Sequence, residues 1–235
     1  MKNLKFLTSS LVAHRGMHGK KITENTLEAF ELAIKNNYII EFDIHLLKDK
    51  NIVVYHDNNL KRLTGMNKKI RKLTLQEINQ IKLPNNLKIP TLKDTLNFIN
   101  GKVPIIIELK TDNKAGKLEK ELVKYLDNYK GLFAVKSFNP LTIKWFKNHR
   151  PNYIRGLLLS EKNNICHKMM RTSFVFNLCK PDFLSCNYLL YNHKIMKRKI
   201  LKLSWTINSK ANFEKYKGYF DNLICENILE EIHKI

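Results

Sequence analysis

Short apolar runs alternate with helical stretches along almost the whole 235-residue chain. Runs such as 103–109 and 154–159 have the length and apolar character of buried strands. Stretches such as 26–36 place apolar residues three and four apart, which is the spacing of one helix face. This alternation predicts βαβ crossovers and a parallel sheet with both faces covered by helices. We expect strands at 11–13, 39–47, 52–55, 103–109, 132–135, 154–159, 183–186, 200–206 and 223–225, and helices at 26–36, 118–129, 141–149, 165–178 and 213–216.

Charged and histidine-containing strings stand at the carboxyl ends of four expected strands. A parallel barrel carries its chemistry at that end of its strands. Two histidines, three carboxylates, an arginine and a lysine would therefore meet at one mouth. This is the set needed to hold a divalent cation and cleave a phosphate ester. The strings are His14-Arg15-Gly16, Glu41-Phe42-Asp43, Tyr55-His56-Asp57 and Glu108-Leu109-Lys110.

The carboxylates favour a metal site. Glu41 and Asp43 are two residues apart on an expected strand, so their side chains leave the same face. Neighbouring carboxylates repel unless a proton or a cation lies between them, and oxygen ligands suit Mg²⁺ or Ca²⁺. An exposed strand face with ordinary polar residues is the alternative interpretation. Glu108 on the next main strand would complete a three-carboxylate site, whereas we expect His45 at a loop edge rather than among the ligands.

Histidines and cationic side chains supply the rest of the chemistry. His14 and His56 both end strand-like runs, and histidine is the usual general acid or base near neutral pH. A lone histidine is more often structural, but two of them opposite a metal triad favour catalysis. Lys110 could hold a phosphate oxygen or form a salt bridge with Glu108, and Arg15 could hold a phosphate through two hydrogen bonds.

The segment 57–90 interrupts the alternation. It is long, basic and polar, and Thr74–Ile78 within it opens like a capping box. We expect an insertion between an early strand and the next helix, lying over the barrel mouth. The length of the chain suits one domain over 1–235 better than two.

Charge and cysteine content narrow the possible partners and location. The net charge of +21 comes from lysine spread along the sequence, and 194–202 is its densest basic stretch. This pattern argues against direct nucleic-acid binding and allows at most a weak, salt-sensitive attraction to an anionic membrane surface. The four cysteines form no Cys-x-x-Cys pair, which favours free thiols in a reducing compartment. With no apolar stretch near the ~18 residues of a membrane span, we expect a cytoplasmic protein.

The ordered set of motifs resembles the glycerophosphodiester phosphodiesterase family. Further strings agree with this family along most of the chain, from about 12 to 227. They are Glu24-Asn25-Thr26, Leu60-Lys61-Arg62-Leu63-Thr64-Gly65, Ile89-Pro90-Thr91-Leu92, Ser137-Phe138 and Trp205-Thr206-Ile207-Asn208. The resemblance implies a (β/α)₈ TIM barrel with a small insertion after the second strand region. It also implies hydrolysis of glycerophosphodiesters to an alcohol and glycerol 3-phosphate.

The resemblance also implies roles for individual residues. One divalent cation, Ca²⁺ or Mg²⁺, would be held by Glu41, Asp43 and Glu108. The acid/base pair would be His14 and His56, the phosphate would bind Arg15 and Lys110, and Trp205 would line the substrate pocket or belong to the barrel core. Glu226 stands where the family carries an aspartate, which leaves the role of the last strand open.

Two other functions remain compatible with these residues. A lysophospholipase D acting on lipid-bearing phosphodiesters would be favoured by an apolar insertion, but 57–90 is mostly polar and basic. A barrel that only binds phosphorylated ligands or anionic surfaces would need neither the histidine pair nor the three carboxylates. A small-molecule glycerophosphodiester is therefore the expected partner.

Overall fold

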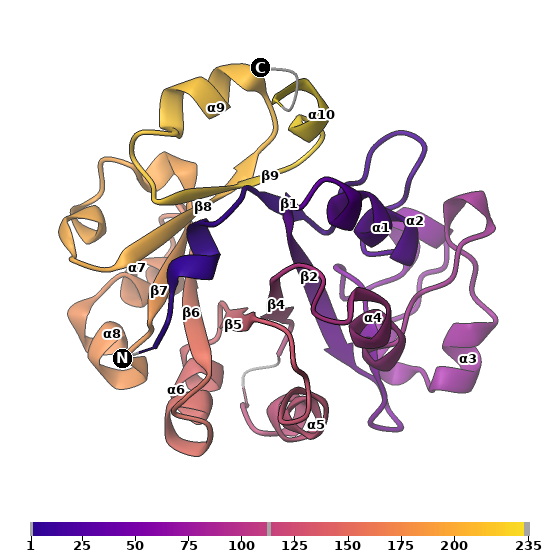
Figure 1. Ribbon diagram of the computed structural model, residues 1–235. Coiled ribbons are helices and arrows are strands. Elements are labelled where there is room, and N and C mark those ends of the chain that lie inside the picture. The colour runs from indigo at the N-terminus through magenta and orange to yellow at the C-terminus, as the bar shows by residue number, and fades with distance from the viewer. Residues whose placement is uncertain (1, 112–113, 233–235) are drawn as a thin grey trace.

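The fold is a closed barrel of eight parallel strands surrounded by helices, as predicted. The computed structural model describes residues 2–111 and 114–232 (Figure 1). Neighbouring barrel strands pair in the order β1, β9, β8, β7, β6, β5, β4, β2, and pairing of β1 with β2 closes the ring. The strands are β1 (Val12–His14), β2 (Ile39–Leu46), β4 (Ile105–Leu109), β5 (Phe133–Ser137), β6 (Ile154–Leu159), β7 (Phe183–Asn187), β8 (Leu201–Ile207) and β9 (Asn222–Cys225).

Helices cover the outside of this barrel, and several begin at side-chain caps. The Thr26 hydroxyl, for example, accepts a hydrogen bond from the Ala29 amide at the start of α1. Across 2–111 and 114–232, no helix combines the length and apolar character that crossing a membrane requires. The covering helices are α1 (Leu27–Lys35), α4 (Leu92–Ile99), α5 (Lys117–Leu126), α6 (Pro140–His149), α7 (Ile165–Met170), α8 (Ser173–Cys179), α9 (Lys210–Tyr216) and α10 (Leu229–Ile232).

The interior of the barrel has an apolar floor. Phe6 and Leu7 of the short 3₁₀ helix η1 (Lys5–Thr8) close the amino-terminal end of the barrel. Above them lies one inward-facing layer of fully or nearly buried residues: Val12, Ile39, Ile106, Ala134, Ile154, Phe183, Leu203 and Ile224. Because side chains of a strand alternate between its faces, the inward residue two positions further along each strand lies one layer higher. That next layer is polar, and it forms the candidate site.

The segment after β2 departs from the barrel pattern. The expected strand at 52–55 exists as β3 (Ile52–Val54), but it pairs antiparallel with β2 outside the ring. The residues that follow pack around a small apolar cluster of their own, which includes Leu60, Ile70 and Ile78. Thr74 and Glu77 form the expected capping box. This insertion contains α2 (Lys61–Thr64), η2 (Ile70–Lys72), α3 (Leu75–Asn79) and η3 (Pro84–Asn86).

One local prediction was refined and another was wrong. The residues expected to be helical around 165–178 form two helices, α7 and α8, because the Thr172 side chain caps a new helix by accepting from the Val175 amide. The Arg171 guanidinium also bonds the carbonyls of Ser160 and Lys162, which ties the break to the end of β6. His45, expected at a loop edge, is fully buried within β2.

Candidate active site

Three acidic side chains meet inside the barrel, above its apolar floor. Glu41, Asp43 and Glu108 are all at least 95% buried, and a carboxylate oxygen of each lies within 4.8 Å of the other two. The register explains this meeting, since Asp43 pairs with Glu108 across β2 and β4. The structure therefore brings together the three carboxylates that the sequence singled out as metal ligands.

Cationic side chains lie against this triad. The Lys110 ammonium is 2.9 Å from Asp43 Oδ1 and also contacts Glu108 Oε1. The Lys136 ammonium is 2.9 Å from Glu41 Oε1 and 3.6 Å from Glu108 Oε2. Lys136 is 1% exposed, and the sequence analysis missed it.

The electric field of nearby cations keeps Asp43 and Glu108 ionised. Burial by itself would raise the pKa of Asp43, but the charges of Lys110, His56 and Arg15 outweigh burial and lower that pKa. The pKa of Glu108 is lowered for the same reason by Lys110 and Lys136, against the effects of burial and of Asp43. The same pairing raises the pKa of Lys110 although the ammonium is buried.

This donor set fits a hard divalent cation. Three carboxylates provide the oxygen ligands that Mg²⁺ and Ca²⁺ prefer, and their oxygens already converge. Among residues 2–111 and 114–232, no thiolate or imidazole group, which would favour a softer metal, belongs to this cluster. Glu41, Asp43 and Glu108 are therefore the residues that would hold the ion.

His14 ends β1 beside the triad and is held by a carboxylate from the last strand. Its Nδ1 lies 2.6 Å from Glu226 Oε2, just beyond the carboxyl end of β9. The hydrogen bond from His14 lowers the pKa of Glu226 to about 2, despite its partial burial. His18 Nε2 lies 4.0 Å from the other Glu226 oxygen. With Nδ1 engaged, Nε2 is the His14 nitrogen left to exchange a proton.

His56 is arranged in the same way, through its sequence neighbour. Its Nδ1 lies 2.6 Å from Asp57 Oδ1, and Arg62 Nε donates to the other oxygen of Asp57 at 2.6 Å. His45 contacts the main-chain carbonyl of His56 at 3.1 Å, and burial lowers the pKa of His45 to about 4. His45 is therefore neutral near pH 7 and acts as a support beneath His56.

The loop between β1 and α1 positions Arg15. Arg15 has a positive φ of 55°, and its amide donates to Glu41 Oε2 at 3.1 Å. Its guanidinium lies 2.8 Å from Glu24 Oε1 and 3.4 Å from Asp43 Oδ2. Gly16 follows with φ 79°, and a Cβ there would lie 2.8 Å from that of Ala29, so only glycine fits.

Each residue of the string Glu24-Asn25-Thr26 has a distinct contact. Glu24 receives two hydrogen bonds from Arg62 as well as the one from Arg15, which connects the insertion to the barrel mouth. The Asn25 side-chain amide donates to Asp43 Oδ2 at 3.0 Å and holds that carboxylate in place. The Thr26 hydroxyl caps α1.

Trp205 lies on β8, at the edge of this polar layer. Its indole N–H donates to the Ser185 carbonyl at 2.9 Å, and its ring packs edge-on against Phe138 with centroids 5.6 Å apart. Both rings line a cavity of about 310 Å³ together with Lys162 and His167. The indole is half-buried; it borders this cavity and also packs against the apolar floor.

Known proteins resemble this chain over nearly its whole length. The model of the glycerophosphoryl diester phosphodiesterase family matches residues 14–225. The glycerophosphodiester phosphodiesterase of Caldanaerobacter subterraneus subsp. tengcongensis is 28% identical over 237 residues, covering 92% of this chain and 93% of that protein. A lysophospholipase D of Homo sapiens is 36% identical over 273 residues, covering 94% of this chain and 82% of that protein.

The fold has close counterparts among solved structures as well. The crystal structure of a glycerophosphodiester phosphodiesterase from Thermotoga maritima superposes with a TM-score of 0.77 at 26% sequence identity. The match covers 96% of this chain and 98% of the Thermotoga protein. The barrel and its mouth therefore belong to the part of the chain that the two proteins share.

Proposed function

Because the chain belongs to the glycerophosphoryl diester phosphodiesterase family, we propose that its barrel mouth hydrolyses glycerophosphodiesters to an alcohol and glycerol 3-phosphate. The protein is thus an enzyme, a phosphoric diester hydrolase. One observation carries the assignment of the site. Three converging carboxylates lie beside two histidines, and each histidine is held at Nδ1 by a carboxylate of its own.

In this proposal the two histidines move the protons. One histidine removes a proton from the attacking hydroxyl through Nε2, and the other protonates the departing alcohol. Glu226 and Asp57 fix the tautomer and orientation of the two rings and stabilise whichever ring becomes positively charged. The attacking hydroxyl belongs to water or to the glycerol of the substrate.

The phosphate is held by the cationic side chains around the triad. Arg15 and Lys110 are the groups that bind its oxygens, since both lie at the mouth and keep their positive charge. A divalent cation, Ca²⁺ or Mg²⁺, bound by Glu41, Asp43 and Glu108 would neutralise negative charge that builds up on the phosphate. Trp205 would pack against the glycerol or the head group, because its ring borders the adjoining cavity.

The first test is release of glycerol 3-phosphate by the purified protein. Glycerophosphocholine and glycerophosphoethanolamine are supplied in turn with Ca²⁺, with Mg²⁺ and with excess chelator. We expect release with a divalent cation and none with chelator. A folded protein that releases no glycerol 3-phosphate under any of these conditions would overturn the proposal.

A lysophospholipase D activity is the second candidate, favoured by the human relative of that name at 36% identity. It would use the same site on a phosphodiester that carries an acyl chain. The assay supplies lysophosphatidylcholine and measures choline together with lysophosphatidic acid. Faster release of choline from lysophosphatidylcholine than from glycerophosphocholine would make this the main reaction.

The location we propose is a reducing, cytoplasmic one. All four cysteines are free, and Cys179, Cys186 and Cys225 are buried. Burial raises the pKa of the Cys186 thiol to about 12, which keeps it protonated and unreactive. Finding the protein in the cytosolic fraction, with all four thiols reduced on alkylation under denaturing conditions, would agree with this.

A further inference from the structure

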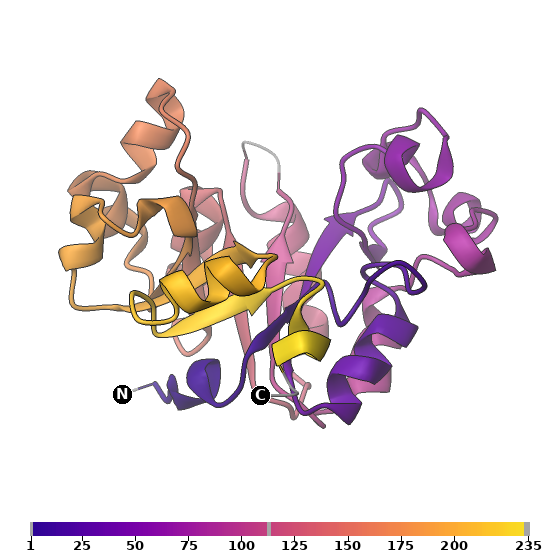
Figure 2. The same cartoon turned by 90° about the horizontal axis from the view of Figure 1, so that it is seen from above.

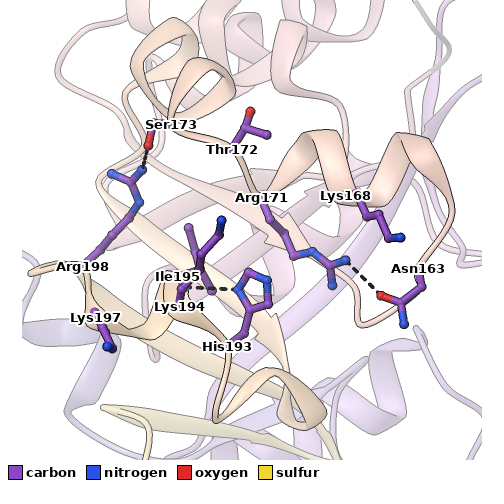
Figure 3. Close-up of a pocket in the computed structure, with 10 residues that line it drawn as sticks. All are labelled: Asn163, Lys168, Arg171, Thr172, Ser173, His193, Lys194, Ile195, Lys197 and Arg198. Carbon is purple, nitrogen blue, oxygen red and sulfur yellow. Dashed lines mark hydrogen bonds between the residues drawn. The ribbon is translucent and has the colours of Figure 1, made fainter.

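A basic cavity lies beside the barrel mouth, outside the candidate active site. It has a volume of about 720 Å³ and lies between the α7–α8 segment and η5 (Lys194–Lys197) (Figure 3). The lining includes Lys168, Lys194 and Lys197, and no acidic residue is among the described residues around it. Within 2–111 and 114–232 these three ammonium groups have no hydrogen-bond or ion-pair partner, so their charge is directed at solvent.

The two arginines of this cavity have structural roles instead. Arg171 is 7% exposed and bonds main-chain carbonyls of the loop after β6. Arg198 donates to the Ser173 hydroxyl at 2.7 Å (Figure 3). Its guanidinium lies 4.2 Å from the centre of the Phe176 ring. Arg171 and Arg198 therefore hold in place the segments that carry the lysines.

Large apolar side chains protrude from the same segment. Ile165 is 83% exposed, Met169 is 56% exposed, and Phe174 at the start of α8 is 73% exposed. Ile165 and Met169 are four residues apart on α7, so they share one face of that helix. Three such side chains within ten residues are costly to leave in water, and Lys168 lies between them in sequence.

Both segments are on the catalytic side of the barrel. The α7–α8 segment follows the carboxyl end of β6, and η5 follows the carboxyl end of β7 through η4 (Tyr188–Leu190). Figure 2 shows the orange α7 region rising on the same side of the strands as the insertion, on the other flank of the barrel. The cavity lined by Trp205 and Phe138 also contacts α7 through His167.

From this arrangement we propose that the α7–α8 segment and η5 form a docking surface for an anionic phospholipid bilayer. The exposed Ile165, Met169 and Phe174 insert among the lipid head groups, and Lys168, Lys194 and Lys197 bind the lipid phosphates. Apolar side chains flanked by lysines are complementary to such a surface in both polarity and charge. Docking in this way places the bilayer beside the barrel mouth. The proposal requires no catalytic activity and holds or fails independently of the proposed function.

The test measures co-sedimentation of the full-length protein with vesicles. One set of vesicles contains phosphatidylcholine alone, and the other contains equal parts of phosphatidylcholine and phosphatidylglycerol. We expect binding to the anionic vesicles only, weakening steeply as the salt concentration rises from 0.05 to 0.5 M. Equal binding to both vesicle types, or no binding to the anionic vesicles at low salt, would overturn the proposal.

Two double variants separate the contributions of charge and of apolar insertion. Lys194→Gln with Lys197→Gln should weaken binding roughly 25-fold, because each lysine near an anionic surface contributes about fivefold. Ile165→Ser with Met169→Ser should weaken it at least about tenfold. The matched control is Lys130→Glu with Leu132→Ser, which changes an exposed lysine and an exposed leucine at the amino-terminal end of β5.

The control variant should bind vesicles like the wild type. A thermal melt of each variant shows that the barrel remains folded. If the control loses as much binding as the other two variants, the attraction is diffuse rather than local and the docking surface is refuted. If the lysine variant instead loses affinity for single-stranded DNA while vesicle binding is unchanged, the surface serves nucleic acid and the proposal is also wrong.

Discussion

Replacing Lys136 with methionine tests whether a buried lysine stabilises the three buried carboxylates of the barrel. The Lys136 ammonium lies 2.9 Å from Glu41 and 3.6 Å from Glu108, and its side chain is 2% exposed. Methionine has similar length and no charge, so the substitution leaves Glu41 without this partner. Removing one member of a buried ion pair costs about 3–5 kcal/mol of unfolding free energy.

This cost should be visible in the melting temperature. For a domain of this size, about 1 kcal/mol changes the melting temperature by roughly 2–4 °C, so in chelator we expect a decrease of roughly 6–20 °C. Addition of Mg²⁺ or Ca²⁺ should raise the melting temperature of the variant more than that of the wild type. The reason is that a cation bound at the carboxylates replaces the missing positive charge and stabilises only the folded state. Differential scanning calorimetry with and without divalent cation measures both effects.

A surface lysine provides the control for this experiment. Lys35 is 2.9 Å from Glu31 on α1, and both side chains are more than half exposed. Its replacement by methionine should cost less than about 1 kcal/mol and should leave the response to metal unchanged. A Lys136→Met variant that melts within about 2 °C of the wild type in chelator would contradict this role of Lys136. Divalent cations that raise both melting temperatures equally would contradict it as well.

The other predictions concern the mouth of the barrel. His56→Ala should lower turnover of glycerophosphocholine by about 10²–10⁴-fold while circular dichroism shows an intact barrel; a variant with wild-type turnover would exclude His56 from proton transfer. Glu226→Gln should lower kcat by about tenfold or more with little change in KM, since the amide no longer fixes the tautomer of His14; Glu226→Asp should restore part of the rate. The low pKa of Glu226, about 2 against an ordinary 4.5, means that its stabilising effect is complete above pH 4.5 and is lost as the pH falls toward 2. Urea unfolding at pH 6, 4 and 3 should therefore show that the wild type loses its advantage over Glu226→Gln with acidification, and a constant difference would contradict this. Trp205→Ala should raise KM several-fold and leave kcat nearly unchanged in steady-state kinetics, whereas a large loss of kcat alone would assign Trp205 a different role.

The barrel could be predicted because its signal is local and repeated. Each strand is a short apolar run and each crossover is a helix, so the sequence places the strands without knowledge of their partners. The meeting of Glu41, Asp43 and Glu108 follows from the same pattern, because parallel strands end at one mouth. The antiparallel pairing of β3 was less visible, since an apolar triplet does not show the direction of its neighbour.

Contacts that form only when the barrel closes could not be predicted from the sequence in this way. Glu226 reaches His14 only because β9 pairs with β1, where Ala13 is opposite Cys225. The role of Lys136 was not predicted because the chain has 42 basic residues, and nothing in the composition distinguishes one lysine from the others. A signal did exist, because Lys136 is two positions after the floor residue Ala134 on β5 and must therefore face inward.

The balance of charge links these buried residues to the chemistry. Three carboxylates in the barrel are contacted by three cationic side chains, Arg15, Lys110 and Lys136, so the cluster is close to neutral by itself. A divalent cation would add two positive charges to this buried cluster, and a phosphodiester would bring one negative charge back. Each therefore offsets part of the electrostatic cost of placing the other there. A site proposed to hold both has to carry its own counter-charges when neither is bound, which accounts for the buried lysines beside the three carboxylates.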